Sequence, residues 1–368
     1  TDGATTTRTP NIENVEVFKV KNTDATGNED VIAYDLINTA STFSTLYNDN
    51  SSDSVDFLNL QNIPGLVKLA LANSTTTVDF EGTALTGAAD TLNVEILGTD
   101  STTLALTGGS TLLGQVIETV SIKSDSVANT LVDLQTTGVG TTSLVTTGPK
   151  QLTITAALDS EITSIDASGM TGLSGLALGA APGTAVGITA TGSGGKDTIY
   201  GSAGKDNISS GGGNDTINLG TVAATDTVDG GAGTDTVVAT ASITNDSVFA
   251  GLSNVETLSL TGAIDATLTA ATATFDTIVL PADNNTVTLD TSYGGTTTTV
   301  NITGDTDSND TITNSSGSTL IVVAEIEDLN GASNTTITAS ATNLNDELIL
   351  TPTGTSGELG TQITGFDK

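Results

Sequence analysis

The sequence contains neither cysteine nor histidine. Without cysteine the chain can form no disulfide, and zinc sites built on thiolate or imidazole ligands are excluded. A Ser-His-Asp triad, an H-E-x-x-H zinc centre and a cysteine nucleophile are excluded for the same reason. The lack of cysteine fits an exported protein whose folding does not depend on oxidation.

Aromatic residues make up 3% of the chain, and tryptophan is absent. Paired carboxylates could still support glycosidase-like chemistry, but sugar subsites are normally lined by aromatic rings. Because 43 residues are acidic, two carboxylates close together would mean little. The usual general acid–base residue, histidine, is missing as well. We therefore expect a protein without enzymatic activity.

Basic residues are also scarce. Nine Lys and Arg stand against 43 Asp and Glu, which gives a formal net charge of -34. Such self-repulsion destabilises a compact state unless counter-ions neutralise it, and bound divalent cations would do so economically. Nucleic acid and anionic membranes are disfavoured as partners, because both need a basic patch.

Long hydrophobic segments are missing too. No run of 18 apolar residues and no apolar leader segment occurs, so we expect neither a membrane span nor a signal peptide within this sequence. The chain has many short apolar runs instead, such as VDFLNL, GLVKLAL and TTVDF, and these are typical of strands separated by turns. With few aromatics, each core layer must be thin, which suits coils stacked along an axis. The predicted fold is all-β, made of elongated β-solenoid or β-sandwich-like modules.

Two segments near the start are expected to differ from this pattern. Residues 1–10 are polar, which predicts a flexible lead-in. Between Val31 and Tyr47 the apolar residues recur at intervals of three to four, which favours one amphipathic helix even though Thr and Ser disfavour it. These residues are Ile32, Leu36, Ile37, Ala40, Phe43 and Tyr47.

Glycine and aspartate recur at a fixed interval between Gly192 and Val238. GSGGKDTIY, GSAGKDNIS and SGGGNDTIN follow one another without a gap, and TVAATDTVD and GGAGTDTVV follow after an insertion of Leu219 and Gly220. Each copy places an aspartate at its sixth position and Ile or Val two residues later. This is the pattern of a calcium-binding nonapeptide repeat. A Gly/Asp-rich loop without metal is the alternative reading.

The residue types fit calcium chemistry. Aspartate supplies a hard oxygen ligand, and glycine allows positive φ and close approach of backbone carbonyls to an ion. The candidate ligands are Asp197, Asp206, Asp215, Asp226 and Asp235, with the turn glycines Gly192, Gly195, Gly201, Gly204, Gly211, Gly213, Gly230 and Gly233. The copy at residues 221–229 lacks every turn glycine, so Asp226 is the ligand expected to fail.

The repeat length also predicts how the coils stack. If two nonapeptides make one coil, Asp197 and Asp215 lie one coil apart and share an ion. The same spacing pairs Asp206 with Asp226 and Asp215 with Asp235, but the insertion makes each of these separations two residues longer. The insertion at Leu219 and Gly220 then predicts a bulge.

Four further aspartates stand just ahead of predicted strands, as in the nonapeptides, but without the bracketing glycines. For these residues the two interpretations, calcium ligand and plain turn residue, are equally supported, since aspartate also caps turns. They are Asp90, Asp276, Asp310 and Asp346.

The nonapeptides resemble those of the RTX family, in which GGxGxDxUx repeats form a parallel β-roll and proteins usually leave the cell by type I secretion. The phrases LTIT, SIDASGMTG and VETLSLTG are similar to those of bacterial S-layer proteins that carry RTX repeats. The resemblance implies an extracellular, cell-surface protein with calcium as its cofactor. It implies β-rich modules at residues 1–190 and 241–368 around an RTX β-roll at residues 191–240.

Two functions remain open. The first is an S-layer subunit that folds on binding extracellular calcium and assembles with copies of itself into a lattice. A cell-surface polysaccharide, contacted through a region outside this chain, is a further candidate partner. The second is an RTX adhesin, or the repeat domain of a larger secreted toxin or enzyme. The lack of aromatic and arginine anchors favours the first.

Overall fold

The structure is a computed structural model of the 368-residue chain. It describes residues 5–23, 31–37, 42–70, 74–85, 87, 89–98, 102–109, 115–136, 138–184, 186–243, 246–262, 264–269, 274–281, 284–303, 309–325, 335–340, 345–351, 362–364 and 366. The described chain forms two compact units, Thr1–Gly204 with Gly211–Gly213, and Lys205–Ser210 with Asn214–Lys368. The division falls within the nonapeptide repeats.

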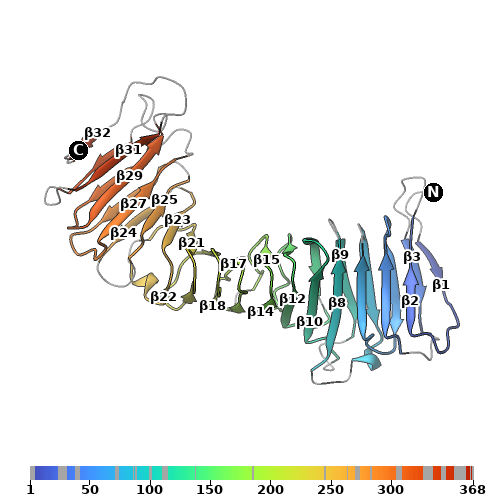
Figure 1. Ribbon diagram of the computed structural model, residues 1–368. Coiled ribbons are helices and arrows are strands. Elements are labelled where there is room, and N and C mark those ends of the chain that lie inside the picture. The colour runs from blue at the N-terminus through green and yellow to red at the C-terminus, as the bar shows by residue number, and fades with distance from the viewer. Residues whose placement is uncertain are drawn as a thin grey trace. The chain divides into compact units, whose positions relative to one another are not determined.

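The first unit is a parallel β-solenoid, in which alternate strands of the chain enter two different sheets (Figure 1). One sheet contains β1 (Thr5–Arg8), β3 (Val31–Asp35), β5 (Val55–Leu60), β7 (Thr75–Phe80), β9 (Thr102–Gly108), β11 (Asn129–Gln135), β13 (Leu152–Ile154), β15 (Ser174–Leu178) and β17 (Lys196–Tyr200). The other contains β2 (Val17–Val20), β4 (Thr45–Asp49), β6 (Leu66–Ala70), β8 (Thr91–Leu97), β10 (Thr119–Asp125), β12 (Ser143–Gly148), β14 (Ser164–Met170) and β16 (Thr189–Thr191).

The second unit is built in the same way, from three parallel sheets. They contain β19 (Thr216–Gly220), β21 (Thr236–Ala239), β23 (Thr257–Leu260), β25 (Thr277–Val279), β27 (Thr297–Asn301), β29 (Thr319–Glu325) and β31 (Glu347–Thr351); β18 (Asn207–Ser209), β20 (Thr227–Asp229) and β22 (Leu252–Ser253); and β24 (Asp265–Leu268), β26 (Thr286–Leu289), β28 (Thr311–Asn314), β30 (Thr336–Thr338) and β32 (Gln362–Thr364). The described helices are two short 3-10 turns, Gly82–Ala84 and Asp246–Phe249. The prediction of an all-β solenoid is confirmed.

Stacked aliphatic side chains form the core of each unit. Successive residues of a strand point to opposite faces, so every second residue meets its equivalent in the next coil. In the first unit one such row runs through Leu92, Val120, Leu144, Ile165 and Ala190, none more than 2% exposed. In the second unit the row Val237, Leu258, Ile278, Val300 and Val322 is fully buried. Aliphatic residues thus form most of the core, and a few buried phenylalanines, such as Phe57, Phe249 and Phe275, add to it.

The helix expected between Val31 and Tyr47 is wrong. Val31–Asp35 is strand β3, and Tyr47 lies in strand β4. Strand β3 pairs with both β1 and β5, so the neighbouring coils supply the hydrogen bonds that a helix would have made internally. The flexible lead-in is wrong for Thr5–Arg8, which forms strand β1. Thr9 and Pro10 lie in no strand, and residues 1–4 lie outside the described residues.

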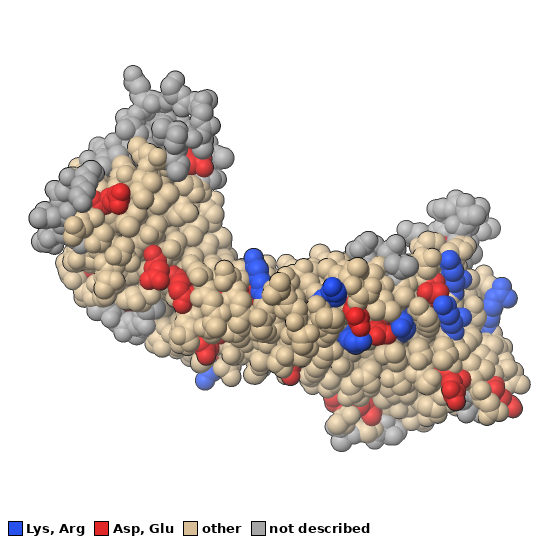
Figure 2. Space-filling view, in the orientation of Figure 1, with Lys and Arg blue, Asp and Glu red and all other residues tan. Residues whose placement is uncertain are grey.

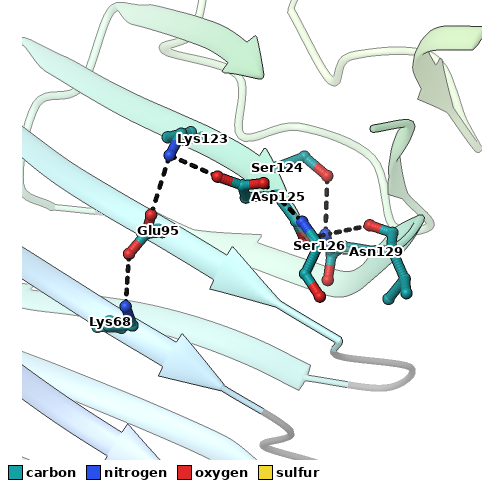
Figure 3. A network of polar contacts seen from close by, with 8 residues as sticks. Lys68, Glu95, Lys123, Ser124, Asp125, Ser126 and Asn129 are labelled. Atoms are coloured by element: carbon teal, nitrogen blue, oxygen red, sulfur yellow. Dashed lines mark hydrogen bonds and ion pairs between the residues drawn. The ribbon is translucent and has the colours of Figure 1, made fainter. Parts of the chain in front are cut away.

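A row of long polar side chains crosses the second sheet of the first unit. Strand pairing places Lys19, Tyr47, Lys68, Glu95 and Lys123 side by side on strands β2, β4, β6, β8 and β10. We call these five residues the lysine row. Glu95 lies between two lysines, with its Oε2 2.8 Å from Lys68 Nζ and its Oε1 3.1 Å from Lys123 Nζ (Figure 3).

Replacing Glu95 with glutamine is expected to lower the free energy of unfolding by about 0.5 to 1 kcal/mol at pH 7, because the two lysines lose their shared counter-charge. The hydrogen bond from Lys68 is the main reason that the pKa of Glu95 lies below 4.5, its ordinary value. A lowered carboxyl pKa gives stability that is present above the unfolded-state pKa and is lost as pH falls through the folded-state pKa. Urea denaturation in calcium should therefore separate the two proteins at pH 7 and bring them together near pH 3, whereas a difference that persists at pH 3 would point to lost packing.

Candidate calcium-binding site

The nonapeptides form the short strands β17 to β21. In each copy the Ile or Val two residues after the aspartate points inward, as predicted. Ile199, Ile208, Ile217, Val228 and Val237 are at most 1% exposed. The aspartates themselves are buried as well, although carboxylates are rarely enclosed without a partner. The candidate calcium site therefore lies in the turn that precedes each strand.

Two nonapeptides make one coil, because residues 18 apart in the sequence lie against each other. A Cβ on Gly211 would lie 2.1 Å from the Ser193 carbonyl oxygen, 18 residues earlier, and the Gly212 N–H donates a hydrogen bond to the same oxygen at 2.9 Å. The turn at 211–213 therefore lies on the turn at 193–195. After the insertion the step becomes 20 residues, with Asn207 opposite Thr227 and Thr216 opposite Thr236.

The additional residues are absorbed locally. The pairing of β19 with β21 changes register between Asn218 and Gly220, and Gly220 has a φ of 66°. The bulge predicted at Leu219 and Gly220 is therefore confirmed. It lets the chain accommodate a 20-residue coil without moving the inward row of Ile and Val.

The turn glycines have two different roles. Gly211, Gly213 and Gly233 have positive φ values of 100°, 113° and 143°, as the repeat predicts. Gly195 and Gly230 are instead required by close approach, since a Cβ would lie 2.3 Å from the Gly172 carbonyl oxygen and 1.9 Å from the Asn254 carbonyl oxygen. The remaining predicted glycines, Gly192, Gly201 and Gly204, do not have the expected positive φ.

The structure brings two of the predicted aspartate pairs together. The Asp206 N–H donates to Asp226 Oδ1 at 3.1 Å, and the Asp215 N–H donates to Asp235 Oδ1 at 2.8 Å. The carboxylates of Asp226 and Asp235 thus accept backbone N–H groups of the aspartates that lie one coil earlier. The third predicted pair, Asp197 with Asp215, relates residues of different compact units and stays a prediction.

Asp197 occupies the corresponding place in the first unit. Its Oδ1 accepts the Leu176 N–H at 2.6 Å, and its Oδ2 accepts the N–H and hydroxyl of Ser193 at 2.7 and 2.8 Å. Burial is the largest effect on its ionisation and raises the pKa above 3.8, although the bonds from Ser193 and Leu176 oppose it. A bound cation would stabilise the charged form that burial disfavours.

Asp226 is held as firmly as the aspartates of the glycine-containing copies. It is 2% exposed, and its Oδ2 accepts the Ala223 N–H at 2.9 Å while its Oδ1 binds Asp206. A backbone bond from Asp226 N–H to the Ala223 carbonyl closes the turn without glycine. The missing glycines therefore leave the carboxylate in place, and its expected failure as a ligand stays a prediction.

Asp235 has the clearest capacity for a cation. Its side chain is fully buried and its Oδ2 accepts no hydrogen bond in the described part of the chain. Burial raises the pKa of Asp235, and the nearby negative charges of Glu256 and Asp229 raise it further. An enclosed carboxylate oxygen without a donor is costly, and a cation beside it would relieve that cost.

These residues fit a calcium site made mostly of backbone oxygen. The described residues contain no group of three or more acidic side chains that could hold a metal together. Calcium accepts about six to eight oxygens, so carbonyls of the glycine turns would have to complete the shell around one or two aspartates. Asp197, Asp206, Asp215, Asp226 and Asp235 would supply the charged oxygens. A bound ion would neutralise buried carboxylates and tie successive coils together.

The four aspartates outside the repeats separate into different roles. Asp310 and Asp346 are fully buried and accept the amides of Asn285 and Leu320 at 2.7 Å each, one coil earlier. Asp346 Oδ2 also accepts the Ser340 N–H at 2.9 Å, so hydrogen bonds engage both of its oxygens. Asp90 Oδ2 accepts the Gly87 N–H at 3.1 Å, as a turn residue does, whereas the Asp276 side chain is exposed. These contacts favour structural roles for Asp90 and Asp346, and the choice between calcium ligand and turn residue stays a prediction for Asp276 and Asp310.

Two glutamates that the sequence analysis did not propose act in the same way as the buried aspartates. Glu256 Oε2 accepts the Asp235 N–H at 2.8 Å, and Glu118 Oε2 accepts the Asp90 N–H at 2.6 Å. The sequence contains a signal for both, because each glutamate lies within a similar motif, VIETVSI or NVETLSL, and directly precedes a strand. A glutamate there extends the line of carboxylates beyond the nonapeptides.

Residues 189–221 and 223–242 match the RTX calcium-binding nonapeptide repeat, a family model of four copies. RTX nonapeptides are calcium-binding motifs, so calcium is the metal for this segment. Proteins with such repeats are usually secreted, which suggests an extracellular location. No curated protein and no solved structure matches the chain. Within the described residues, no helix has the length and apolar character needed to cross a membrane.

Proposed function

We propose that this chain is a non-catalytic structural protein of the cell surface, an S-layer subunit exported by type I secretion and assembled with copies of itself in the presence of calcium. The line of buried carboxylates across stacked coils, in a chain of net charge -34, is the observation that carries the proposal. The absence of histidine and cysteine supports a non-catalytic role.

Calcium would couple folding to export. In a cytosol poor in calcium the carboxylates repel one another, and the chain stays extended. Outside the cell each bound ion selects the folded coils and stabilises them by mass action. Extracellular calcium modules typically bind at about 10⁻⁴ to 10⁻³ M, which places the transition between the two compartments.

Self-assembly has its own test. Negative-stain electron microscopy of the purified chain is expected to show ordered two-dimensional sheets in calcium at millimolar concentration and dispersed particles in chelator. The ions neutralise the acidic surface and order the coils that form the contacts. Circular dichroism of the same samples controls for folding. Particles that are fully folded in calcium yet remain dispersed would contradict the lattice and favour the alternative, an RTX adhesin or the repeat domain of a larger secreted protein.

A further inference from the structure

The last nonapeptide stacks on a turn that does not belong to the repeats. Its own turn, residues 230–235, lies against residues 251–256, because strand β21 pairs with β23 and the Asp235 carbonyl accepts the Glu256 N–H at 3.2 Å. The matched repeats stop at residue 242. We call these two turns the junction. A site between them would take half of its groups from outside the repeats.

Two oxygen atoms of the junction face the place that a side chain on Gly230 would fill. A Cβ there would lie 1.9 Å from the Asn254 carbonyl oxygen and 2.8 Å from Asp235 Oδ2. Asp235 is fully buried, and its Oδ2 accepts no hydrogen bond in the part of the chain that the structure describes. Two acceptor oxygens that lie close together without a donor repel each other, and a cation between them would make the arrangement favourable.

Two further carboxylates lie at the junction. Glu256 Oε2 accepts the Asp235 N–H at 2.8 Å, which leaves Oε1 for another ligand. Asp229 Oδ1 accepts Asn254 Nδ2 at 2.7 Å and the Gly231 N–H at 3.2 Å. Burial is the main reason that the pKa of Asp235 is raised, and the negative charges of Glu256 and Asp229 raise it further. The junction thus concentrates negative charge around a buried carboxylate.

The second unit has very little positive charge to balance these carboxylates. Lys205 and Lys368 are its only basic residues, and the sequence between them contains neither lysine nor arginine. In Figure 2 the blue of Lys and Arg lies mostly over the first unit, while red appears on both units. A metal cation can supply the charge that side chains do not.

We propose that the junction binds a calcium ion, with Asp235, Glu256 and the Asn254 carbonyl as ligands. Calcium prefers hard oxygens, and carboxylates mixed with backbone carbonyls are typical of its sites. The charge of Asp229 strengthens the site without coordinating the ion. Asn254 has a φ of 52°, which asparagine adopts more readily than most residues, and this conformation brings its carbonyl against Gly230.

An ion at the junction joins the nonapeptides to the coils that follow them. It makes the order of β23 and the later coils depend on calcium, although these coils lie beyond the matched repeats. The inference rests on calcium binding by the nonapeptides but not on lattice assembly. It fails alone if the nonapeptides bind calcium and the junction variants bind it as the native chain does.

The test counts bound calcium by equilibrium dialysis at free calcium from about 10⁻⁵ to 10⁻² M. Glu256→Gln keeps an oxygen that can accept the Asp235 N–H but removes the charge. Glu118→Gln is the matched control, because Glu118 accepts the Asp90 N–H at 2.6 Å within the similar motif VIETVSI, beside an aspartate that is not fully buried. Circular dichroism confirms that each variant is folded at the highest calcium concentration.

We expect Glu256→Gln to bind one ion fewer than the native chain at about 10⁻³ M calcium and to need about tenfold more calcium to regain it. Glu118→Gln should bind calcium as the native chain does. Equal losses in the two glutamine variants would overturn the proposal, and so would a native binding curve for Glu256→Gln.

Asp229→Asn tests the same ion without touching the hydrogen bond between Glu256 and Asp235. Removing this nearby charge should weaken the ion by about threefold. If Glu256→Gln does not fold, this variant decides, and a native binding curve for it would contradict the junction site.

Hydrogen–deuterium exchange locates the ion that Glu256→Gln loses. At about 10⁻³ M calcium the amides of residues 252–260 should exchange at least about tenfold faster than in the native chain, whereas those of β18 and β20 keep their protection. An equal loss of protection in β18 and β20 would show that Glu256 acts on the nonapeptides as a whole, and the junction site would be wrong.

Discussion

Replacing Asp235 with asparagine is expected to raise the calcium concentration at the folding midpoint by about tenfold or more. The substitution keeps Oδ1 as acceptor for the Asp215 N–H but removes the charge beside the unbonded Oδ2. A site that loses a charged ligand binds calcium more weakly, and each tenfold loss corresponds to about 1.4 kcal/mol. The measurement is the β-sheet circular dichroism signal across a calcium titration of both proteins.

Asp346→Asn is the matched control for Asp235→Asn. Both oxygens of Asp346 accept backbone amides, so an amide nitrogen there would face a donor and leave it without an acceptor. We expect a loss of about 1 to 3 kcal/mol in the free energy of unfolding at saturating calcium, with the calcium midpoint changed far less than in Asp235→Asn. If the two variants shifted the midpoint equally, the distinction between ligand and structural carboxylate would be wrong.

Gly213→Ala is expected to destabilise the coils by about 3 kcal/mol, even in saturating calcium. Gly213 has a φ of 113°, and a Cβ would lie 2.7 Å from both the Gly195 carbonyl carbon and the Lys196 amide nitrogen. Backbone atoms of a stacked coil cannot move aside, so the side chain must separate the coils or strain the turn. Urea denaturation monitored by circular dichroism measures the difference.

The control for this substitution lies in the same group of repeats. A Cβ on Gly194 would meet nothing within 4 Å, and its φ is outside the positive range. Gly194→Ala should therefore change the free energy of unfolding by no more than about 0.5 kcal/mol. Equal effects of the two alanines would show that the close stacking of the turns at 193–195 and 211–213 is not what stabilises the repeats.

The strands could be predicted because a coil needs only local signals. VDFLNL alternates apolar and polar residues and is bounded by turn residues, and it forms β5 over the predicted residues Val55–Leu60. The helix prediction for residues 31–47 was wrong because apolar residues at intervals of three to four fit short strands as well as a helix. The neighbouring coils favour the strand, because β1 and β5 pair with β3 on its two sides.

The site was predictable in position but not in its contacts. The nine-residue period gave the aspartates, the two-nonapeptide coil and the bulge at Gly220. It could not show that the Asp235 carboxylate would accept the Asp215 amide, because that bond depends on how two turns 20 residues apart align in three dimensions. Asp346 accepts the Leu320 N–H in the same way, across 26 residues and outside any sequence repeat. Only the structure shows that Asp346 resembles the aspartates of the nonapeptides.

Circular dichroism of the chain from chelator through a calcium titration tests most directly whether calcium binding drives the folding of the coils. We expect little β-sheet signal in chelator and a cooperative rise between about 10⁻⁴ and 10⁻³ M calcium, because bound calcium offsets the cost of enclosing the charged aspartates of the nonapeptides. Magnesium at the same concentration controls for simple charge screening and should not replace calcium. A complete β-sheet signal already present in chelator would contradict folding linked to calcium.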